Sequence, residues 1–316
     1  MEQFTEQLIN ALVLGGIYAL IAVGYTMVYG IIELINFAHG EIFMFGAYFA
    51  FTLVTVFNLP FWVALPMSML LCAGIGMLMD LVAYRPLRNA ARLSALITAI
   101  GVSIGLQNLA RIIWGARQRP FPSESLPTFL KQGIPPSEPL PAFSLTETAI
   151  ALPGGAFLPY RDLCIILLAF ALMIALNRLV SLTKIGKAMR ACAQNRVAAN
   201  LMGINTNRVI VITFAIGSAL GAVAGVMVGV KEIIEPTMGY YKGVAAFAAA
   251  VLGGIGNITG AMVGGLLIGF AEVFGAGYIP GGYGSGYRVA IAYIVMIAVI
   301  LIRPSGLFGK STATRA

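Results

Sequence analysis

Long apolar runs separated by short polar segments make up most of this chain. No charged residue occurs within residues 7–32, 42–79 or 243–271. Because a helix needs about 20 apolar residues to cross the hydrocarbon core of a bilayer, the first run predicts one crossing. The second run, at 38 residues, is long enough for two crossings, with Asn58-Leu59-Pro60 as the turn between them.

The remaining apolar runs extend this all-helical pattern. Single crossings are predicted for residues 93–110, 163–182, 209–230 and 289–302. Residues 243–279 are interrupted by Gly253-Gly254-Ile255-Gly256-Asn257, so we expect a half-helix that enters from outside and a second helix that returns, since protein-buried irregular backbone is tolerated at membrane depth. The prediction is an all-α polytopic membrane protein of about eight transmembrane helices, including this broken, re-entrant pair, in a single transmembrane domain of residues 1–316.

The composition excludes the class of soluble globular proteins. Hydrophobic residues make up 59% of the chain and charged residues 10%, whereas soluble domains average about 25% charged residues. The net charge of +8 comes from cations in separate loops, so the chain is predicted to face a lipid bilayer and no nucleic acid. The three cysteines lack the spacing of a metal site; we expect no metal and assign them packing roles.

Cations are distributed unevenly along the sequence, which predicts the orientation. Residues 182–208 contain no acidic residue and five cations: Lys184, Lys187, Arg190, Arg196 and Arg208. Short loops rich in Lys and Arg stay in the cytoplasm, so we place this loop there, together with two other acid-free groups: Arg85, Arg88 and Arg92, and the C-terminal Arg303, Lys310 and Arg315. The N-terminus and the Pro-rich segment 115–161 are then external; that loop either meets an external partner or caps the bundle.

The interior of the cytoplasmic loop predicts a short helix. Residues 196–202 are good helix formers, with Val197 and Leu201 on one face, and Gly203 is a typical helix stop. Such a helix presents a small apolar face to the groove of a partner. The alternative is an ordinary basic loop.

One polar cluster stands out beside the apolar runs. Glu33, Asn36, His39 and Glu41 fall within nine residues, and polar groups at the edge of hydrocarbon are costly unless they are paired or hydrated. We therefore regard the cluster as a candidate functional site. It also fits a capped helix end, with Asn36 as the N-cap and His39 and Glu41 among the lipid headgroups.

Other polar and small residues favour packing or solvation. A stripe of glycines at a spacing of four lets another helix approach closely, and we favour packing within the chain over a subunit interface: Gly217, Gly221, Gly225 and Gly229. Glu272 is interpreted as a solvated acid near the outer surface. A group of external charges either meets a partner or forms a solvated run: Lys231, Glu232, Glu235 and Lys242.

Several motifs together resemble a known family. They are Ile35-Asn36-Phe37-Ala38-His39-Gly40-Glu41 followed by Gly46-Ala47-Tyr48, then Arg85-Pro86-Leu87-Arg88, Val197-Ala198-Ala199-Asn200-Leu201-Met202-Gly203-Ile204, and Ala246-Phe247-Ala248-Ala249-Ala250-Val251-Leu252-Gly253-Gly254-Ile255-Gly256. In this order, over about residues 12–280, they resemble the LivH-type permeases of ATP-binding-cassette (ABC) importers for branched-chain amino acids.

The resemblance implies partners and sites. It implies a multi-pass permease of the bacterial inner membrane, without a cofactor, that pairs with a second related permease, two cytoplasmic ABC ATPase subunits and a periplasmic amino-acid-binding protein. The coupling loop of residues 182–208 would dock on the ATPase through Arg196, Ala198, Ala199, Met202, Gly203 and Ile204. Candidates for the translocation path are Asn36, His39, Gly40, Glu41, Tyr48, Gly253, Gly254 and Gly256.

Two alternatives remain at this point, and neither is an enzyme. The same architecture could carry urea or short amides, or the chain could be an ion-coupled secondary transporter with His39, Glu41 or Glu272 as a proton site. Gly309-Lys310-Ser311 ends like a nucleotide-binding loop, but Pro304 stands where that loop needs its first glycine. Because no catalytic arrangement is present in the sequence, ATP hydrolysis is assigned to separate subunits.

Overall fold

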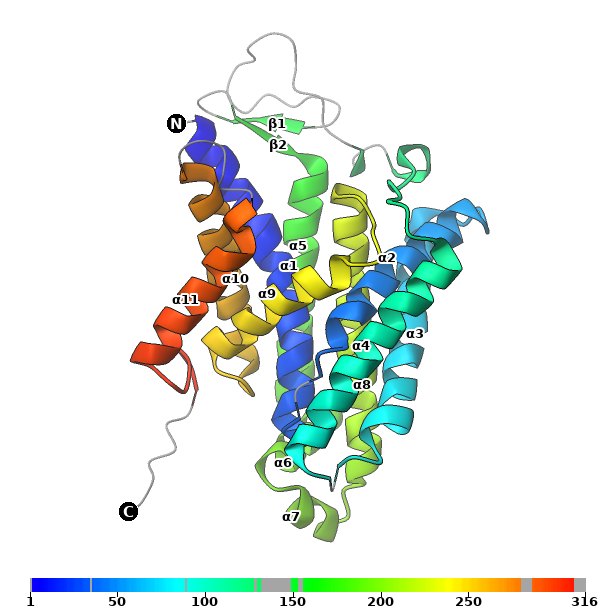
Figure 1. The fold of residues 1–316 in the computed structure, drawn as a ribbon, viewed down its shortest axis with the longest axis vertical. Coiled ribbons are helices and arrows are strands. Elements are labelled where there is room, and N and C mark those ends of the chain that lie inside the picture. Colours follow the sequence, from blue (N-terminus) through cyan, green and yellow to red (C-terminus); the bar gives the residue numbers. More distant parts are fainter. Residues whose placement is uncertain are drawn as a thin grey trace.

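The computed structural model describes residues 2–34, 36–88, 90–127, 130–131, 149–152, 156–279 and 286–309. Within them, nine helices form one bundle (Figure 1): α1 (Glu2–Ile32), α2 (His39–Thr55), α3 (Phe61–Met79), α4 (Arg92–Trp114), α5 (Tyr160–Leu182), α8 (Thr206–Lys231), α9 (Met238–Gly253), α10 (Ile258–Tyr278) and α11 (Arg288–Ile302). Short elements lie at the ends of the bundle: the π-helical turn η1 (Asp80–Tyr84), the 3₁₀ turn η2 (Ser123–Ser125), strands β1 (Ala149–Ala151) and β2 (Phe157–Pro159), and helices α6 (Lys184–Gln194) and α7 (Arg196–Leu201).

The predicted class of an all-α polytopic membrane protein is confirmed. Six helices of the described residues are long and apolar enough to cross a membrane, namely α1, α3 with η1, α4, α5, α8 and α10, and α11 is a shorter apolar helix. The turn predicted at Asn58-Leu59-Pro60 lies between α2 and α3, where Asn58 has a φ of 52°. The strands β1 and β2 and the helices α6 and α7 lie at opposite ends of the bundle (Figure 1).

Helix α1 lies at the centre of the bundle because it is apolar on every side. Its residues are buried almost continuously from Val13 to Val28, and a helix that is hydrophobic all round belongs in a protein interior. It packs against α5, α8, α9 and α10. The remaining helices are therefore arranged around α1.

Two helices shorter than α1 and α8, namely α2 and α9, begin in the middle of the bundle. Helices α1 and α8 run in opposite directions, and after each of them the chain turns back before a shorter helix begins, at His39 and at Met238. The starts of α2 and α9 meet: Gly40 lies against Gly239 and Gly243, and a Cβ atom on Gly243 would lie 2.9 Å from the Cα of Gly40. The two segments, residues 30–51 and 231–252, therefore have the same construction and run in opposite directions.

The re-entrant pair differs in detail from its prediction. The pair is present as α9 and α10, but the glycine turn between them does not lie at half depth. Gly256 lies beside Gly30 near the inner end of α1, and Leu252 and Gly253 accept backbone hydrogen bonds from Leu307 and Phe308 after α11. The break at half depth is instead at the start of α9, because residues 232–237 return into the bundle before the helix forms. Each helix of the bundle thus has a predicted counterpart, with the broken pair counted as two helices.

The glycines of α8 lie where α2 and α1 approach most closely. Gly217 faces Gly24, Gly221 faces His39 and Phe43, Gly225 faces the backbone of Phe43, and Gly229 faces Ala47 and Ile234. A Cβ atom on Gly225 would overlap the carbonyl oxygen of Phe43, and backbone atoms cannot rotate away as a side chain can. The stripe therefore packs within this chain.

We predict that Gly225→Ala destabilises the bundle by about 1–3 kcal/mol, the usual cost of overpacking a core. The matched control is Gly105→Ala on α4, where no atom lies within 4 Å of the added Cβ and alanine is the better helix former. Thermal unfolding of the purified variants in detergent measures the difference. Equal melting temperatures for the two variants would show that the α2–α8 contact is not closely packed in solution.

Candidate functional site

Three of the four polar residues of the cluster lie inside the bundle at the start of α2: Asn36, His39 and Glu41 are 2%, 1% and 0% exposed. The fourth, Glu33, is exposed just after the end of α1. The residue before α2 is Ala38, which makes no side-chain capping bond, and His39 lies beside Gly217 near the midpoint of α8. The interpretation as a solvated helix cap among headgroups is therefore wrong for the three buried residues, because α2 begins inside the bundle.

Each member of the cluster is held by a different part of the bundle. The hydroxyl of Tyr84 in η1 donates to Asn36 Oδ1 at 2.7 Å. Ser103 Oγ and Gln107 Nε2, one turn apart on α4, donate to Glu41 Oε1 at 2.9 and 2.8 Å. The cluster thus joins the inner end of α3 and the middle of α4 to the start of α2.

The ring of His39 occupies space that three glycines leave open. A Cβ atom on Gly24 would overlap the ring, and Gly217 and Gly221 lie on its other side. Tyr25 contacts the ring edge to face, with centroids 5.0 Å apart. His39 Nε2 has no hydrogen-bond partner among the described residues, so the ring is fixed by packing on α1 and α8.

Glu41 is a buried acid with one free oxygen. No ion pair involves its carboxylate in the described part of the chain, and Oε2 has no hydrogen-bond partner there. A Cβ atom on Gly239 would lie 2.5 Å from this oxygen, so only a glycine at that position lets the start of α9 approach the carboxylate. Oε2 is therefore enclosed, with Gly239 packed against it.

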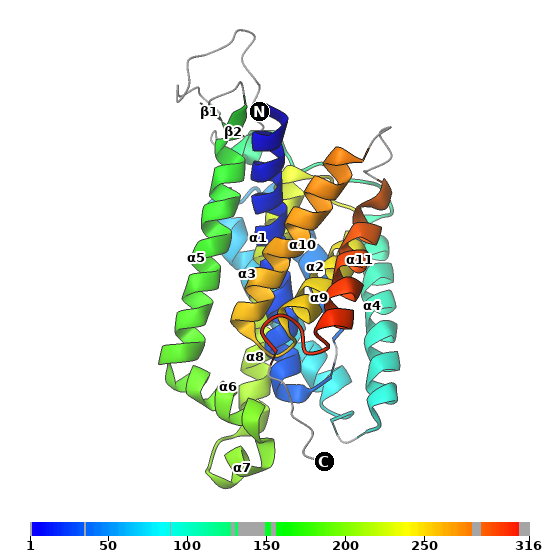
Figure 2. The same cartoon turned by 90° about the vertical axis from the view of Figure 1, so that its left-hand side faces the viewer.

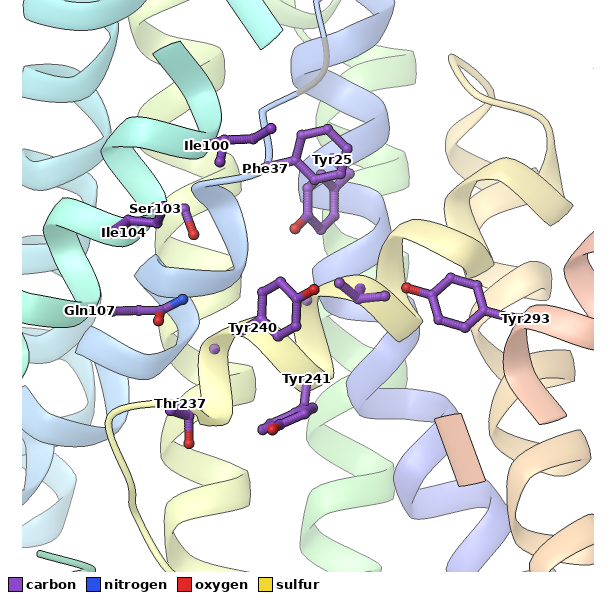
Figure 3. A pocket seen from close by; sticks show the side chains of 13 residues that line it. Tyr25, Phe37, Ile100, Ser103, Ile104, Gln107, Thr237, Tyr240, Tyr241 and Tyr293 are labelled. Atoms are coloured by element: carbon purple, nitrogen blue, oxygen red, sulfur yellow. The ribbon is translucent and has the colours of Figure 1, made fainter. Parts of the chain in front are cut away.

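A cleft of about 480 Å³ adjoins this carboxylate. Figure 3 shows Ser103, Gln107, Tyr240 and Tyr241 around it. Most of its wall comes from α4, with Ile100, Ser103, Ile104 and Gln107, and from α9, with Gly239, Tyr240, Tyr241, Gly243 and Val244. Tyr25 of α1, Tyr293 of α11, Phe37 before α2 and Thr237 before α9 complete it. Sequence reasoning missed Ser103 and Gln107, although two polar residues four apart in an apolar helix mark one face of that helix.

None of the eight predicted path residues lines this cleft, although Glu41 and Gly40 contact residues that do. Tyr48 is further along α2 and stacks on Trp114, with centroids 4.7 Å apart. Gly253, Gly254 and Gly256 lie at the opposite end of α9, against Gly260, Gly309 and Gly30. The structure thus brings Asn36, His39, Gly40 and Glu41 together and does not bring the other four candidates to them.

The predicted coupling loop forms helices α6 and α7. The side chain of Asn195 caps α7 by accepting from Ala198 N, and the helix ends before Gly203, which has a φ of 82°. Ala199 is buried and its carbonyl accepts from Ile204 N, whereas Leu201 and Met202 are each 83% exposed. Arg196 begins the helix. Burial raises the pKa of the Cys192 thiol, and the charge of Arg196 lowers that pKa by a smaller amount.

The charges assigned to the outer side differ from their interpretation. Glu272 is 3% exposed, and Tyr18 donates to its Oε2 at 2.7 Å. It is therefore not a solvated acid, because α1 covers that face of α10. The remaining external charges form ion pairs, Lys231 with Asp162 at 2.9 Å and Lys242 with Glu232 at 3.2 Å, and Glu235 accepts from Gln118 and Thr237.

Some predictions remain without a structural counterpart. Of the external segment 115–161, residues 128–129, 132–148 and 153–155 lie outside the described residues, as do Lys310 and Arg315.

Arg88 reaches Asn207 at the start of α8, so the loop before α4 lies on the same side as α6 and α7. In the described part of the chain, no group of three His, Cys, Asp or Glu side chains could hold a metal ion.

Comparisons with known proteins agree on one family. The family model described as "Branched-chain amino acid transport system / permease component" matches residues 7–302. The high-affinity branched-chain amino acid transport system permease protein BraD of Pseudomonas aeruginosa is 41% identical over 97% of this chain and 96% of its own length. LivH of Escherichia coli K12 is 40% identical with the same coverage, and the ribose import permease protein RbsC is 30% identical over 38% of this chain. No solved structure matches the chain.

We predict that Tyr84→Phe lowers the free energy of unfolding by about 1–3 kcal/mol, the cost of an unpaired buried polar group. Asn36 Nδ2 already lacks a partner among the described residues, so the variant leaves the whole buried amide without a described hydrogen bond. The control is Tyr287→Phe before α11, whose ring is exposed. Thermal unfolding in detergent compares them, and a Tyr84→Phe protein as stable as the control would contradict the assigned hydrogen bond.

Proposed function

Because the chain belongs to the family of branched-chain amino acid transport permeases, we propose that it is the permease subunit of an ABC importer for leucine, isoleucine and valine in the bacterial inner membrane. The observation that supports this most strongly is 40–41% identity, from end to end, to BraD and LivH. The match to a sugar permease covers much less of the chain. Urea or short amides as cargo, and coupling to an ion gradient, are therefore disfavoured.

We propose that ATP is hydrolysed by two separate cytoplasmic subunits that dock on α7. The exposed apolar side chains Val197, Leu201 and Met202 lie on the helix that extends farthest from the bundle at its inner end (Figure 2). Exposed apolar groups in water favour burial in a partner's groove. The buried Ala199 and the backbone bond to Ile204 join α7 to the start of α8, so movement of a docked subunit would be passed to α8.

A second, related permease is proposed to cover the cleft beside Glu41. Tyr240 and Tyr241 at the start of α9 are about half exposed in this chain alone, and polar side chains at half depth are costly against lipid. By contrast, the outer faces of α3 and α5 expose aliphatic side chains such as Leu70 and Leu167, which suit lipid. A periplasmic binding protein would meet the external end of the two permeases.

We predict that vesicles containing this chain, its partner permease and the ATPase subunits accumulate leucine only when ATP is inside and loaded binding protein outside. An uncoupler should leave the initial rate within about twofold, because no ion gradient is needed in this scheme. Radiolabelled leucine uptake is the measurement, with urea and ribose as control solutes. Uptake by the purified chain alone that an uncoupler abolishes would refute the proposal.

We predict that Leu201→Glu weakens ATPase docking roughly tenfold or more, since a carboxylate is costly to bury in an apolar groove. Gly203→Val should act in the same direction, because a β-branched residue is strained at a φ of 82°. The control is Leu301→Glu, a similarly exposed leucine at the end of α11 and outside residues 182–208. Copurification of the ATPase and its leucine-dependent hydrolysis are measured, and full retention of both in Leu201→Glu would exclude α7 as the docking element.

A further inference from the structure

We propose that the cleft between α4 and α9 binds the transported amino acid at half depth, with the ligand's ammonium group on Glu41 and its carboxylate on Gln107. This inference rests on the proposed function and adds a binding site to it. The site combines three observations: a fully buried carboxylate with a free oxygen, a cleft beside it, and two neutral donors that lie between them.

Glu41 differs from the buried acids that have structural partners. Asp80 is bound by Arg88 at 2.7 Å and Asp162 by Lys231 at 2.9 Å, so each has its counter-ion within the chain. Glu272 accepts a hydrogen bond from Tyr18, which does not line the cleft, whereas both donors to Glu41 do. Glu41 has only neutral donors in the described residues, and a buried carboxylate without a cation costs several kcal/mol. A cationic ligand group would supply the missing counter-ion.

The two donors to Glu41 also face the ligand space. Ser103 and Gln107 line the cleft and donate to Glu41 Oε1. An ammonium group that enters the cleft can replace one of them on the carboxylate, because a charge-assisted hydrogen bond is about twice as strong as a neutral one. The released amide of Gln107 then donates to the ligand's carboxylate. Gly239, which packs against the buried Oε2, also lines the cleft.

The rest of the cleft suits an aliphatic side chain. Ile100, Ile104 and Val244 supply branched apolar groups, with Phe37 beside them, and the volume of about 480 Å³ is within the range of small-molecule sites. Tyr240, Tyr241 and Thr237 add hydroxyl groups at the mouth. A zwitterion with a branched side chain therefore meets complementary groups at both of its ends, whereas urea or a sugar has no ammonium group for Glu41.

The decisive variant is Glu41→Gln in the complete importer, with saturating leucine-loaded binding protein outside the vesicles. Glutamine keeps the shape and one acceptor oxygen for Ser103 and Gln107 but cannot pair with an ammonium group. We expect the initial leucine uptake rate to fall about tenfold or more, by a similar factor for isoleucine and valine. ATP hydrolysis stimulated by the loaded binding protein should stay within about twofold, since the docking surfaces are unchanged. Glu272→Gln, the matched buried acid outside the cleft, should keep both activities within twofold.

A second variant tests the cleft without touching the buried carboxylate. Ile104→Trp adds bulk at a half-exposed position of α4, and it should slow leucine uptake more than valine uptake because the larger side chain needs more room. Uptake by both variants at the wild-type rate would overturn the proposal. So would an equal loss of uptake and stimulated hydrolysis in Glu41→Gln, which indicates a structural role. Failure of the wild-type importer to take up leucine would instead refute the proposed function.

Discussion

The contact between the starts of α2 and α9 determines the rest of the structure. The first turns of two helices can pack against each other at half depth only if no side chains separate their backbones. Gly40, Gly239 and Gly243 provide that contact. Each start is reached by a return from a long helix, so the contact also fixes where α1 and α8 lie. Irregular backbone at this depth requires protein around it, which α1, α4 and α8 supply.

The same contact creates the polar site. A helix start at half depth brings the first polar residues of α2 into the interior, where they must find partners from other elements. Tyr84 and the α4 pair Ser103 and Gln107 meet that need, and Glu41 Oε2 is left over. A polar site in an otherwise apolar bundle is therefore a direct consequence of breaking two helices, as expected for transporters whose discontinuous helices surround a central ligand.

Much of the fold could be predicted from the sequence, because apolar runs and cation placement report directly on crossings and sides. The limits have physical causes. Run length does not reveal where a helix starts inside the membrane, so the glycine turn after α9 is predicted at the wrong depth, and a capped helix end among the headgroups stays open for Asn36, His39 and Glu41. Glu272 lies in the apolar helix α10, and nothing in the neighbouring sequence shows that Tyr18, 254 residues away, donates a hydrogen bond to it. Ser103 and Gln107 were missed for the same reason, since their partner Glu41 lies on another helix.

Helix α8 connects the tip formed by α6 and α7 to this site, and its glycines explain why movement would be transmitted. Its inner end is held by the cap of Asn205 and by Arg88, which also binds Asp80, so the tip, the start of α8 and the inner end of α3 form one unit. Further up, Gly225 brings the backbones of α8 and α2 into contact and Gly221 lies against the ring of His39, so little space is left to absorb a shift. Because closely packed interfaces change between discrete arrangements rather than deform continuously, displacement of α8 must move the start of α2, and with it His39 and Glu41.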